Sequence, residues 1–360
     1  FDSGITDVSE DRSLGSLEDL TTSTDGPIKL VAEAGTITIN GGTDGVGVSA
    51  DGSGDVLLEA RGGSSDVIVD ATVASGSGHI TLDAGRNVDV NAAVTVTSGV
   101  GTIYVLSGVD ADIDTAVTTA NGDILIEAGD DIRQTALISS TAGDIGLIAG
   151  QNVDQSATGD VTTISGDVLV QATAGSWTMD GDATITAGGQ DVLGLAGTNI
   201  RLGVIRVTNA TANRVALEAG SGSITDANGA GVNVEETVSG ATTTLSLRAG
   251  TLIGGAGGTT SATNDQALDL NVDTVAASAA TGIYLREVTA GGPIEVNTAA
   301  GVSIDIEGVV RSDFDSGITD VSEDRSLGSL EDLTTSTDGP IKLVAEAGTI
   351  TINGGTDGVG

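Results

Sequence analysis

The chain has 360 residues, a formal net charge of −38, no cysteine, 55 glycines and only one Trp, two Tyr and two Phe. This charge opposes binding to nucleic acid and to anionic membranes, and the lack of cysteine excludes disulfides and thiolate metal sites. No run of about 20 apolar residues is present, so we expect no membrane insertion in this segment. The hydrophobic content of 39% is too high for a disordered linker, so we expect a core of Val, Ile, Leu and Ala.

The first 47 residues of the chain occur twice. Residues 1–47 and 314–360 are identical at every position, with an offset of 313. Diverged copies of an old duplication would carry substitutions, so we interpret the chain as one full repeat followed by the start of the next, within a longer tandem array. Such faithful repetition is typical of proteins built for length.

A shorter unit recurs inside the long repeat. Its template, at residues 78–84, is Gly, any residue, Ile or Val, any residue, Leu or Val, any residue, Ala. The unit returns, strictly or loosely, from Gly26, Gly54, Gly101, Gly122, Gly143, Gly166, Gln190, Asn213, Thr243, Gln266, Gly292 and Gly339. The spacing of these starts predicts about 13 units in each 313-residue repeat.

The residues within each unit alternate in polarity. In the template, Ile80, Leu82 and Ala84 would face a core, while Thr81 and Asp83 would face outward. This period of two indicates β-strands. A corner of Ala, Gly, two polar residues and an apolar residue then follows, for example at residues 84–88, 128–132, 149–153 and 196–200. Glycine permits the turn, and a second short strand and a weaker third one follow it.

Three short strands in a unit of 21 to 24 residues predict a parallel β-helix, or β-solenoid, in an all-β fold. About 13 coils stacked roughly 4.8 Å apart would rise roughly 60 Å in each repeat. The competing all-β folds fit less well. A propeller blade needs about 40 residues, and a sandwich needs tight hairpins between neighbouring strands.

The unit signature divides the chain into four segments. Residues 1–25 and 307–338 are predicted as acidic junctions, residues 26–306 as the shaft, and residues 339–360 as the start of the next repeat. Leu327, Leu330 and Leu333 have roughly helical spacing, so the second junction is predicted as an acidic loop or a short helix packed on the shaft. The alternative is a joint stiffened by calcium, with Asp320, Glu323 and Asp324 as candidate ligands.

Two further groups of side chains are candidates for a special role. Asp110, Asp112 and Asp114 alternate along a predicted strand and could share a calcium ion, although the glycine and later glutamate of a calcium loop are missing. A solvated strand face is the simpler interpretation. The second group occupies one corner position in successive coils and is predicted to form a stacked ladder that caps backbone groups: Asn87, Asp131, Asn152 and Asn199.

No catalytic centre is predicted. The only histidine, His79, takes an outward strand position beside threonines and aspartates, and it is expected to face solvent rather than to act as a general base. Solenoid enzymes that act on acidic polysaccharides need clustered basic residues, whereas this chain has two lysines and scattered arginines. No cofactor is required, and calcium is the only cation that the pattern suggests.

The sequences GHITLDAGRNVDV at residues 78–90 and GDILIEAGDDI at residues 122–132 resemble the repeats of filamentous-haemagglutinin-type exoproteins. This resemblance covers chiefly residues 26–227 and implies a right-handed parallel β-helix shaft on the bacterial cell surface. The 313-residue repeat departs from that family and is more similar to very long repetitive surface adhesins.

These features predict a non-catalytic extracellular shaft of tandem repeats that projects or links surfaces. Its expected partners are further copies of itself, joined head to tail by covalent continuation or by end-to-end association, with lateral association as a further expectation. The first alternative is a calcium-dependent adhesin that itself binds glycans or neighbouring filaments. A polysaccharide lyase or hydrolase is the second alternative.

Overall fold

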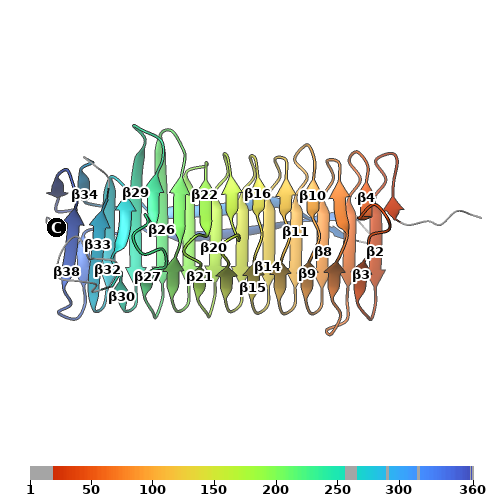
Figure 1. Ribbon diagram of the computed structural model, residues 1–360, viewed down its shortest axis with the longest axis horizontal. Helices are drawn as coiled ribbons and strands as arrows, with labels where there is room; N and C mark the ends of the chain where they lie inside the picture. Colours follow the sequence, from red (N-terminus) through yellow and green to blue (C-terminus); the bar gives the residue numbers. More distant parts are fainter. Residues whose placement is uncertain (1–18, 256–265, 289–291, 314–316, 357, 359–360) are drawn as a thin grey trace, which may run out of the picture.

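The computed structural model describes residues 19–255, 266–288, 292–313, 317–356 and 358. In these residues every regular element is a β-strand, and the strands stack into an elongated solenoid (Figure 1). Most coils have one long strand and two short ones, as in β8 (Ile80–Ala84), β9 (Val88–Val90) and β10 (Val94–Val96). The all-β parallel solenoid predicted from the sequence is confirmed, and its hand stays a prediction.

The long strands form a 14-stranded sheet, called here the long-strand sheet. It contains β2 (Ile28–Ala32), β5 (Val56–Ala60), β8, β11 (Ile103–Ser107), β14 (Ile124–Ala128), β17 (Ile145–Ala149), β20 (Val168–Ala172), β23 (Asp191–Ala196), β26 (Ala212–Ala219), β29 (Thr242–Ala249), β32 (Thr274–Ala279), β34 (Ile294–Val296), β37 (Leu333–Thr335) and β39 (Ile350–Ile352).

The short strands form a second sheet of 23 strands, called here the short-strand sheet, made of two ladders that meet in β33 (Gly282–Glu287). One ladder contains β3 (Ile37–Ile39), β6 (Val67–Val69), β9, β12 (Ala111–Ile113), β15 (Ile132–Gln134), β18 (Val153–Gln155), β21 (Trp177–Met179), β24 (Ile200–Leu202), β27 (Ile224–Asp226) and β30 (Leu252–Ile253). The other contains β1 (Leu20–Thr21), β4 (Val46–Ala50), β7 (Thr72–Ser75), β10, β13 (Val117–Thr119), β16 (Ile138–Ser140), β19 (Val161–Thr163), β22 (Thr184–Ala187), β25 (Val204–Val207), β28 (Val234–Glu236) and β31 (Leu268–Asn271). β38 (Ile341–Ala345) pairs with β33.

The coils stack in register, because each strand pairs in parallel with its equivalent in the next coil. Ile103 lies beside Ile80 on one side and Ile124 on the other, for example. The inward side chains of all three strand types form one continuous aliphatic core. This stacking satisfies the backbone hydrogen bonds and buries the β-branched residues in the same step.

Two predicted coil starts are wrong. Gln266 is predicted to open a coil, but the strand after it, β31, pairs with β28, and Leu245 pairs with Val275 instead. The next unit is displaced by two residues, because Val296 rather than Ile294 pairs with Val275. First and third strands share the same alternation of apolar residues, so only the closure of the coil distinguishes them.

Longer coils near the C-terminal end reduce the number of coils in a repeat. The long-strand sheet has eleven long strands, from β2 to β32. The next layer of this sheet consists of the two short strands β34 and β37, and β38 follows in the short-strand sheet. β38 has the sequence of β2, so 313 residues make about eleven and a half coils. At roughly 4.8 Å for each layer, the rise is about 55 Å.

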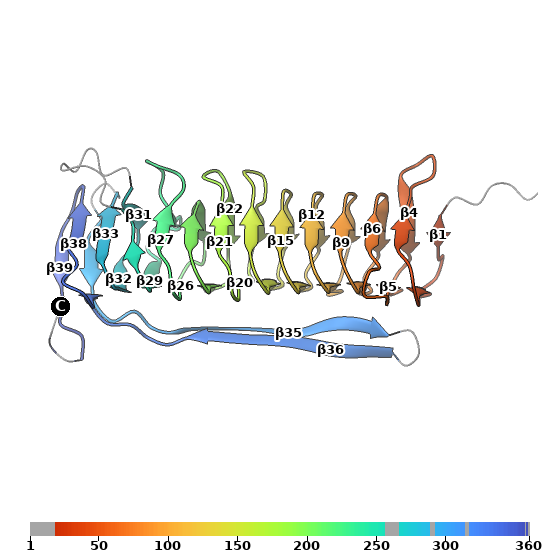
Figure 2. The ribbon, with the colours of Figure 1, turned by 90° about the horizontal axis from the view of Figure 1, so that it is seen from below.

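The second junction differs most from its predicted form. β35 (Val302–Asp313) and β36 (Gly317–Leu327) form an antiparallel hairpin, which runs back along the shaft over the long-strand sheet (Figure 2). The hairpin begins inside the range assigned to the shaft. The predicted short helix is wrong: Leu327 ends β36, Leu330 bridges to Ala299, and Leu333 begins β37. Alternating residues in these strands override the weak helical spacing of the three leucines.

The single tryptophan shows how strictly each layer must keep its volume. Trp177 is fully buried, and its Nε1 donates to Gln155 Oε1 over 2.8 Å. The next coil has Gly194 where its neighbours in the ladder have Val170 and Leu217. A Cβ at Gly194 would lie 2.4 Å from Trp177 Cζ3, so the glycine makes room for the indole ring.

We expect Gly194→Leu to destabilise the shaft by roughly 1–3 kcal/mol or more through overpacking. Trp177→Val leaves a cavity and costs roughly 3 kcal/mol. The double variant restores the residue types of the neighbouring layers and should recover most of the loss, apart from the hydrogen bond to Gln155. Thermal unfolding of the four proteins measures this coupling. Additive losses in the double variant would contradict the packing argument.

Candidate functional site

The hairpin covers an apolar stripe on the outer face of the long-strand sheet. The outward position that Tyr104 occupies in β11 is apolar in several other long strands, with Leu125 in β14, Leu169 in β20 and Leu193 in β23. These side chains and Ile148 form a second buried cluster with hairpin residues Val302, Ile304, Ile306 and Val309. Each fully buried aliphatic side chain contributes roughly 1.5–3 kcal/mol relative to exposure, so this contact holds the hairpin against the shaft.

The stripe has one gap that fits a hairpin side chain. Gly146 occupies the outward position between Leu125 and Leu169 in the ladder. A Cβ at Gly146 would lie 2.5 Å from Ile306 Cδ1, so the glycine admits the isoleucine into the stripe. The match between Gly146 and Ile306 fixes where along the shaft the hairpin lies.

Polar contacts add to this apolar attachment. Thr81 Oγ1 accepts from Ser312 N over 3.0 Å, and Thr102 Oγ1 accepts from Val310 N over 3.0 Å. The side chains of Arg311 and Asp83 form an ion pair. These contacts satisfy buried backbone groups of β35 that its partner strand does not pair.

The base of the hairpin is held by arginines. Arg248 Nη2 donates to Gly328 O over 2.8 Å and to Ser329 O over 2.7 Å. Arg325 Nε donates to Gln171 Oε1 over 2.6 Å. Several of the few cations in this acidic chain therefore attach the hairpin to the shaft.

The sequence does contain evidence for a covered face, but a reading based only on alternating apolar and polar residues overlooks it. Outward strand positions are expected to be polar, yet Leu57, Tyr104, Leu125, Leu169 and Leu193 occupy them. A run of apolar residues at one outward position indicates that something covers that face. The sequence alone does not say what covers it.

The predicted ladder residues lie in one column at the corner after the long strands. Each side-chain oxygen accepts from the backbone N of the equivalent residue in the next coil. The column runs through Asp66, Asn87, Asp110, Asp131, Asn152, Ser176, Asn199 and Ser223, with N···O distances of 3.0–3.4 Å. All four predicted members belong to it, and the corner pattern missed the other four, Asp66, Asp110, Ser176 and Ser223.

The three aspartates predicted as a calcium candidate contact donors of the protein itself. Arg133 Nη1 lies 3.2 Å from Asp110 Oδ2 and 3.2 Å from Asp112 Oδ1. Thr135 Oγ1 donates to Asp114 Oδ1 over 2.6 Å. Asp110 and Asp112 thus meet at a guanidinium, whereas Asp114 accepts from a threonine, and the three carboxylates form no group that could hold a metal ion.

Asp320, Glu323 and Asp324, the candidate calcium ligands of the second junction, also point in different directions. This junction is called here the seam between the two copies. Glu323 lies on the partly buried side of β36 and pairs with Arg325 Nη1 over 2.6 Å, whereas Asp320 and Asp324 are exposed on the other side. Strand alternation separates them, because side chains one and three residues apart point to opposite faces. Within the described ranges, no group of three His, Asp or Glu residues could hold a metal ion.

His79 is half-buried rather than solvent-facing. Its Nδ1 lies 2.9 Å from Thr102 Oγ1, which also bonds the hairpin, and Asp55 Oδ1 accepts from His79 N. Burial lowers the pKa of His79, so its ring is neutral near pH 7. The ring takes part in coil-to-coil hydrogen bonding, because its Nδ1 also accepts from Thr102 N over 3.1 Å.

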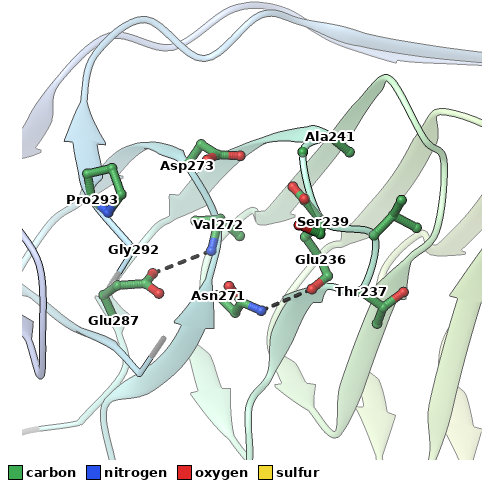
Figure 3. A pocket seen from close by; sticks show the side chains of 12 residues that line it. Glu236, Thr237, Ser239, Ala241, Asn271, Val272, Asp273, Glu287, Gly292 and Pro293 are labelled. Atoms are coloured by element: carbon green, nitrogen blue, oxygen red, sulfur yellow. Dashed lines mark hydrogen bonds between the residues drawn. The ribbon is translucent and has the colours of Figure 1, made fainter. Parts of the chain in front are cut away.

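A cavity of about 580 Å³ opens beside the turn after β28 (Figure 3). The carboxylates of Glu236, Asp273 and Glu287 line it. Thr243 Oγ1 donates to Glu236 Oε2 and Thr243 N to Asp273 Oδ2, each over 2.7 Å. Burial raises the pKa of Glu236, and the neighbouring Asp273 adds to this rise. The described lining holds no histidine, lysine or arginine, so it offers no cationic cradle for an anion.

A second column of carboxylates lies just before the long strands. Asp123 Oδ1 accepts from Asp144 N, and Asp144 Oδ1 accepts from Asp167 N, each over 2.7 Å. Burial raises the pKa of Asp144 to about 6; the hydrogen bond from Asp167 opposes this rise, and the charges of Asp123, Asp167 and Asp305 add to it. The charge of Asp305 on the hairpin thus affects the pKa of Asp144 on the shaft.

Comparison with known proteins finds no matching family model, no matching curated sequence and no matching solved structure. No helix that is long and apolar enough to cross a membrane occurs in the described residues.

We expect Gly146→Leu to displace Ile306 and release the hairpin while the shaft keeps its strands. Hydrogen exchange should show lost protection in residues 302–313, with protection of the inner coils unchanged. Ile306→Ala in the same protein should restore docking, because the smaller side chain gives back the space. Ser322→Leu adds the same bulk on the exposed side of β36 and is the control. Full protection in Gly146→Leu alone would contradict this account.

We expect Asp144 to make stability depend on pH. Because its pKa is raised, the native chain holds a proton that the unfolded chain has lost between about pH 4 and pH 6, so stability falls as the pH rises through this window. Asp144→Asn removes that loss of stability. The melting temperature of the variant, relative to that of the wild type, should therefore increase as the pH rises from about 4 to 7. Asp182→Asn makes the same charge change at an exposed turn, and equal gains in both variants would contradict the assignment.

Proposed function

We propose that this chain is a section of a non-catalytic extracellular shaft in which 313-residue copies continue into one another as one solenoid. The observation that carries the proposal is the different burial of identical residues in the two copies. Ile37 and Ile39 are buried, with 5% and 6% exposure, whereas Ile350 and Ile352 are 38% and 65% exposed. β3 is thus covered by a following strand, β6, whereas β39 pairs with the preceding β34 and has no described strand after it.

The sequence itself names what would cover the open layer. β6 pairs with β3 in the first copy, with Val67 beside Ile37 and Val69 beside Ile39. The residues of the second copy that follow β39 repeat those that follow β3, as far as residue 360. A further copy would add the same strands in the same order, which supports covalent continuation and also satisfies the open strand edge.

A mechanical role fits the other features of the molecule. Stacked repeats give stability through neighbouring interfaces, so length can grow without a new core. The contacts that hold the described carboxylates come from the chain's own arginines, threonines and backbone amides. Lateral association and placement at a bacterial surface remain part of the proposal as the sequence predicts them.

Proteins with one, two and four tandem copies test the proposal. Electron microscopy should show rods whose length grows by about 55 Å for each added copy, with no break at the junctions. A chelator should leave the rods intact. If the rods collapse in chelator, the calcium-dependent adhesin would be favoured. Separate beads joined by linkers would overturn the continuous shaft, and turnover of an acidic polysaccharide by the purified protein would overturn the non-catalytic role.

A further inference from the structure

The two copies of the repeated segment place the same strands in opposite sheets. β2 belongs to the long-strand sheet, but its copy β38 pairs with β33 of the short-strand sheet. β1 and β3 belong to the short-strand sheet, but their copies β37 and β39 pair with β32 and β34 of the long-strand sheet. All three strands exchange sheets between one copy and the next.

The shape of the coils near the seam permits this exchange. β33 is a single strand of six residues that continues both ladders of the short-strand sheet, since it pairs with β30 at Ile283 and with β31 at Leu285. Opposite it, β32 also has six residues. The cross-section therefore has two equal sides here, and a long strand such as β38 fits on the side that carried short strands before.

The long-strand sheet changes in the complementary way. The layer after β32 consists of two short strands, β34 and β37, which pair with the first and second halves of β32. The hairpin leaves the sheet between them. A side that receives two short strands in place of one long strand has the pattern of the short-strand sheet, so each sheet takes over the role of the other.

We propose that consecutive copies follow one another with about a half turn around the shaft axis, so that successive hairpins lie on opposite sides of the shaft. The inference rests on the proposed tandem shaft. Its physical origin is the half-integral number of coils, about eleven and a half, in each repeat. The next copy would then continue from the end layer of β38 and β39, rotated by about a half turn around the shaft axis.

This arrangement determines the pattern along the shaft. Neighbouring hairpins would be about 55 Å apart on opposite sides, and hairpins on one side would be about 110 Å apart. The outward faces of the hairpins carry acids such as Asp305, Glu307 and Asp324. Both sides of the shaft would therefore present the same acidic ridge at regular intervals.

Disulfide trapping in the 360-residue chain tests the exchange of sheets. Tyr284 lies beside Lys342 in the observed pairing. Lys342 is the copy of Lys29, which occupies the same outward position in the long-strand sheet as Ser246 and Ala276. Without exchange of sheets, Lys342 would therefore lie beside Ala276 in the next layer. The chain has no cysteine, so Tyr284→Cys with Lys342→Cys should crosslink rapidly on oxidation, and Ala276→Cys with Lys342→Cys should not. The reverse result would overturn the exchange.

A four-copy protein tests the half turn. Asp305 is exposed on the hairpin, and Asp305→Cys in each copy allows gold labelling. Labels should alternate between the two sides of the rod about 55 Å apart. Labels on one side of a continuous rod would overturn the half turn and leave the shaft in place. Separate beads would overturn the shaft, and the crosslink in the single chain would still report the exchange of sheets.

Discussion

In-register stacking of parallel strands is the constraint on which the whole molecule depends. Each coil must present the same cross-section to the next, because the backbone hydrogen bonds set a constant spacing between them. Glycine at the corners follows from this: a Cβ at Gly122 would lie 2.1 Å from Gly101 O of the coil before. The same rule explains why Trp177 needs Gly194 above it. A large side chain in one layer requires a small one in a neighbouring layer.

The outer surface follows a second rule, in which side chains satisfy the backbone between coils. The corner ladder and the carboxylate column both use side-chain oxygens to accept from amides of the following coil. Much of the acidity of the chain is therefore structural. Arginines such as Arg133 and Arg311 neutralise parts of it, and burial raises the pKa of carboxylates such as Asp144.

The seam brings together the features that are specific to this repeat. There the cross-section changes to two equal sides, the hairpin leaves the long-strand sheet, and the strands of the next copy enter the opposite sheet. The hairpin then lies back over the coils of the first copy through Ile306 and the apolar stripe. A seam that clamps onto the preceding coils would stiffen the place where a uniform solenoid is interrupted. Such stiffening would suit the proposed mechanical role.

The sequence by itself determined the solenoid, its coil period and the positions of the corner ladder, because these depend on local alternation and on residues repeated at one place in each unit. It also located the seam through the duplicated residues. Tertiary structure decided what local patterns cannot express. Gln266 resembles a coil start, yet coil closure places β31 in the third position, and alternation in residues 302–327 suits a hairpin as well as a coil. Which sheet β38 joins depends on pairing with β33, about 60 residues earlier, and that pairing is a property of the packed shaft alone.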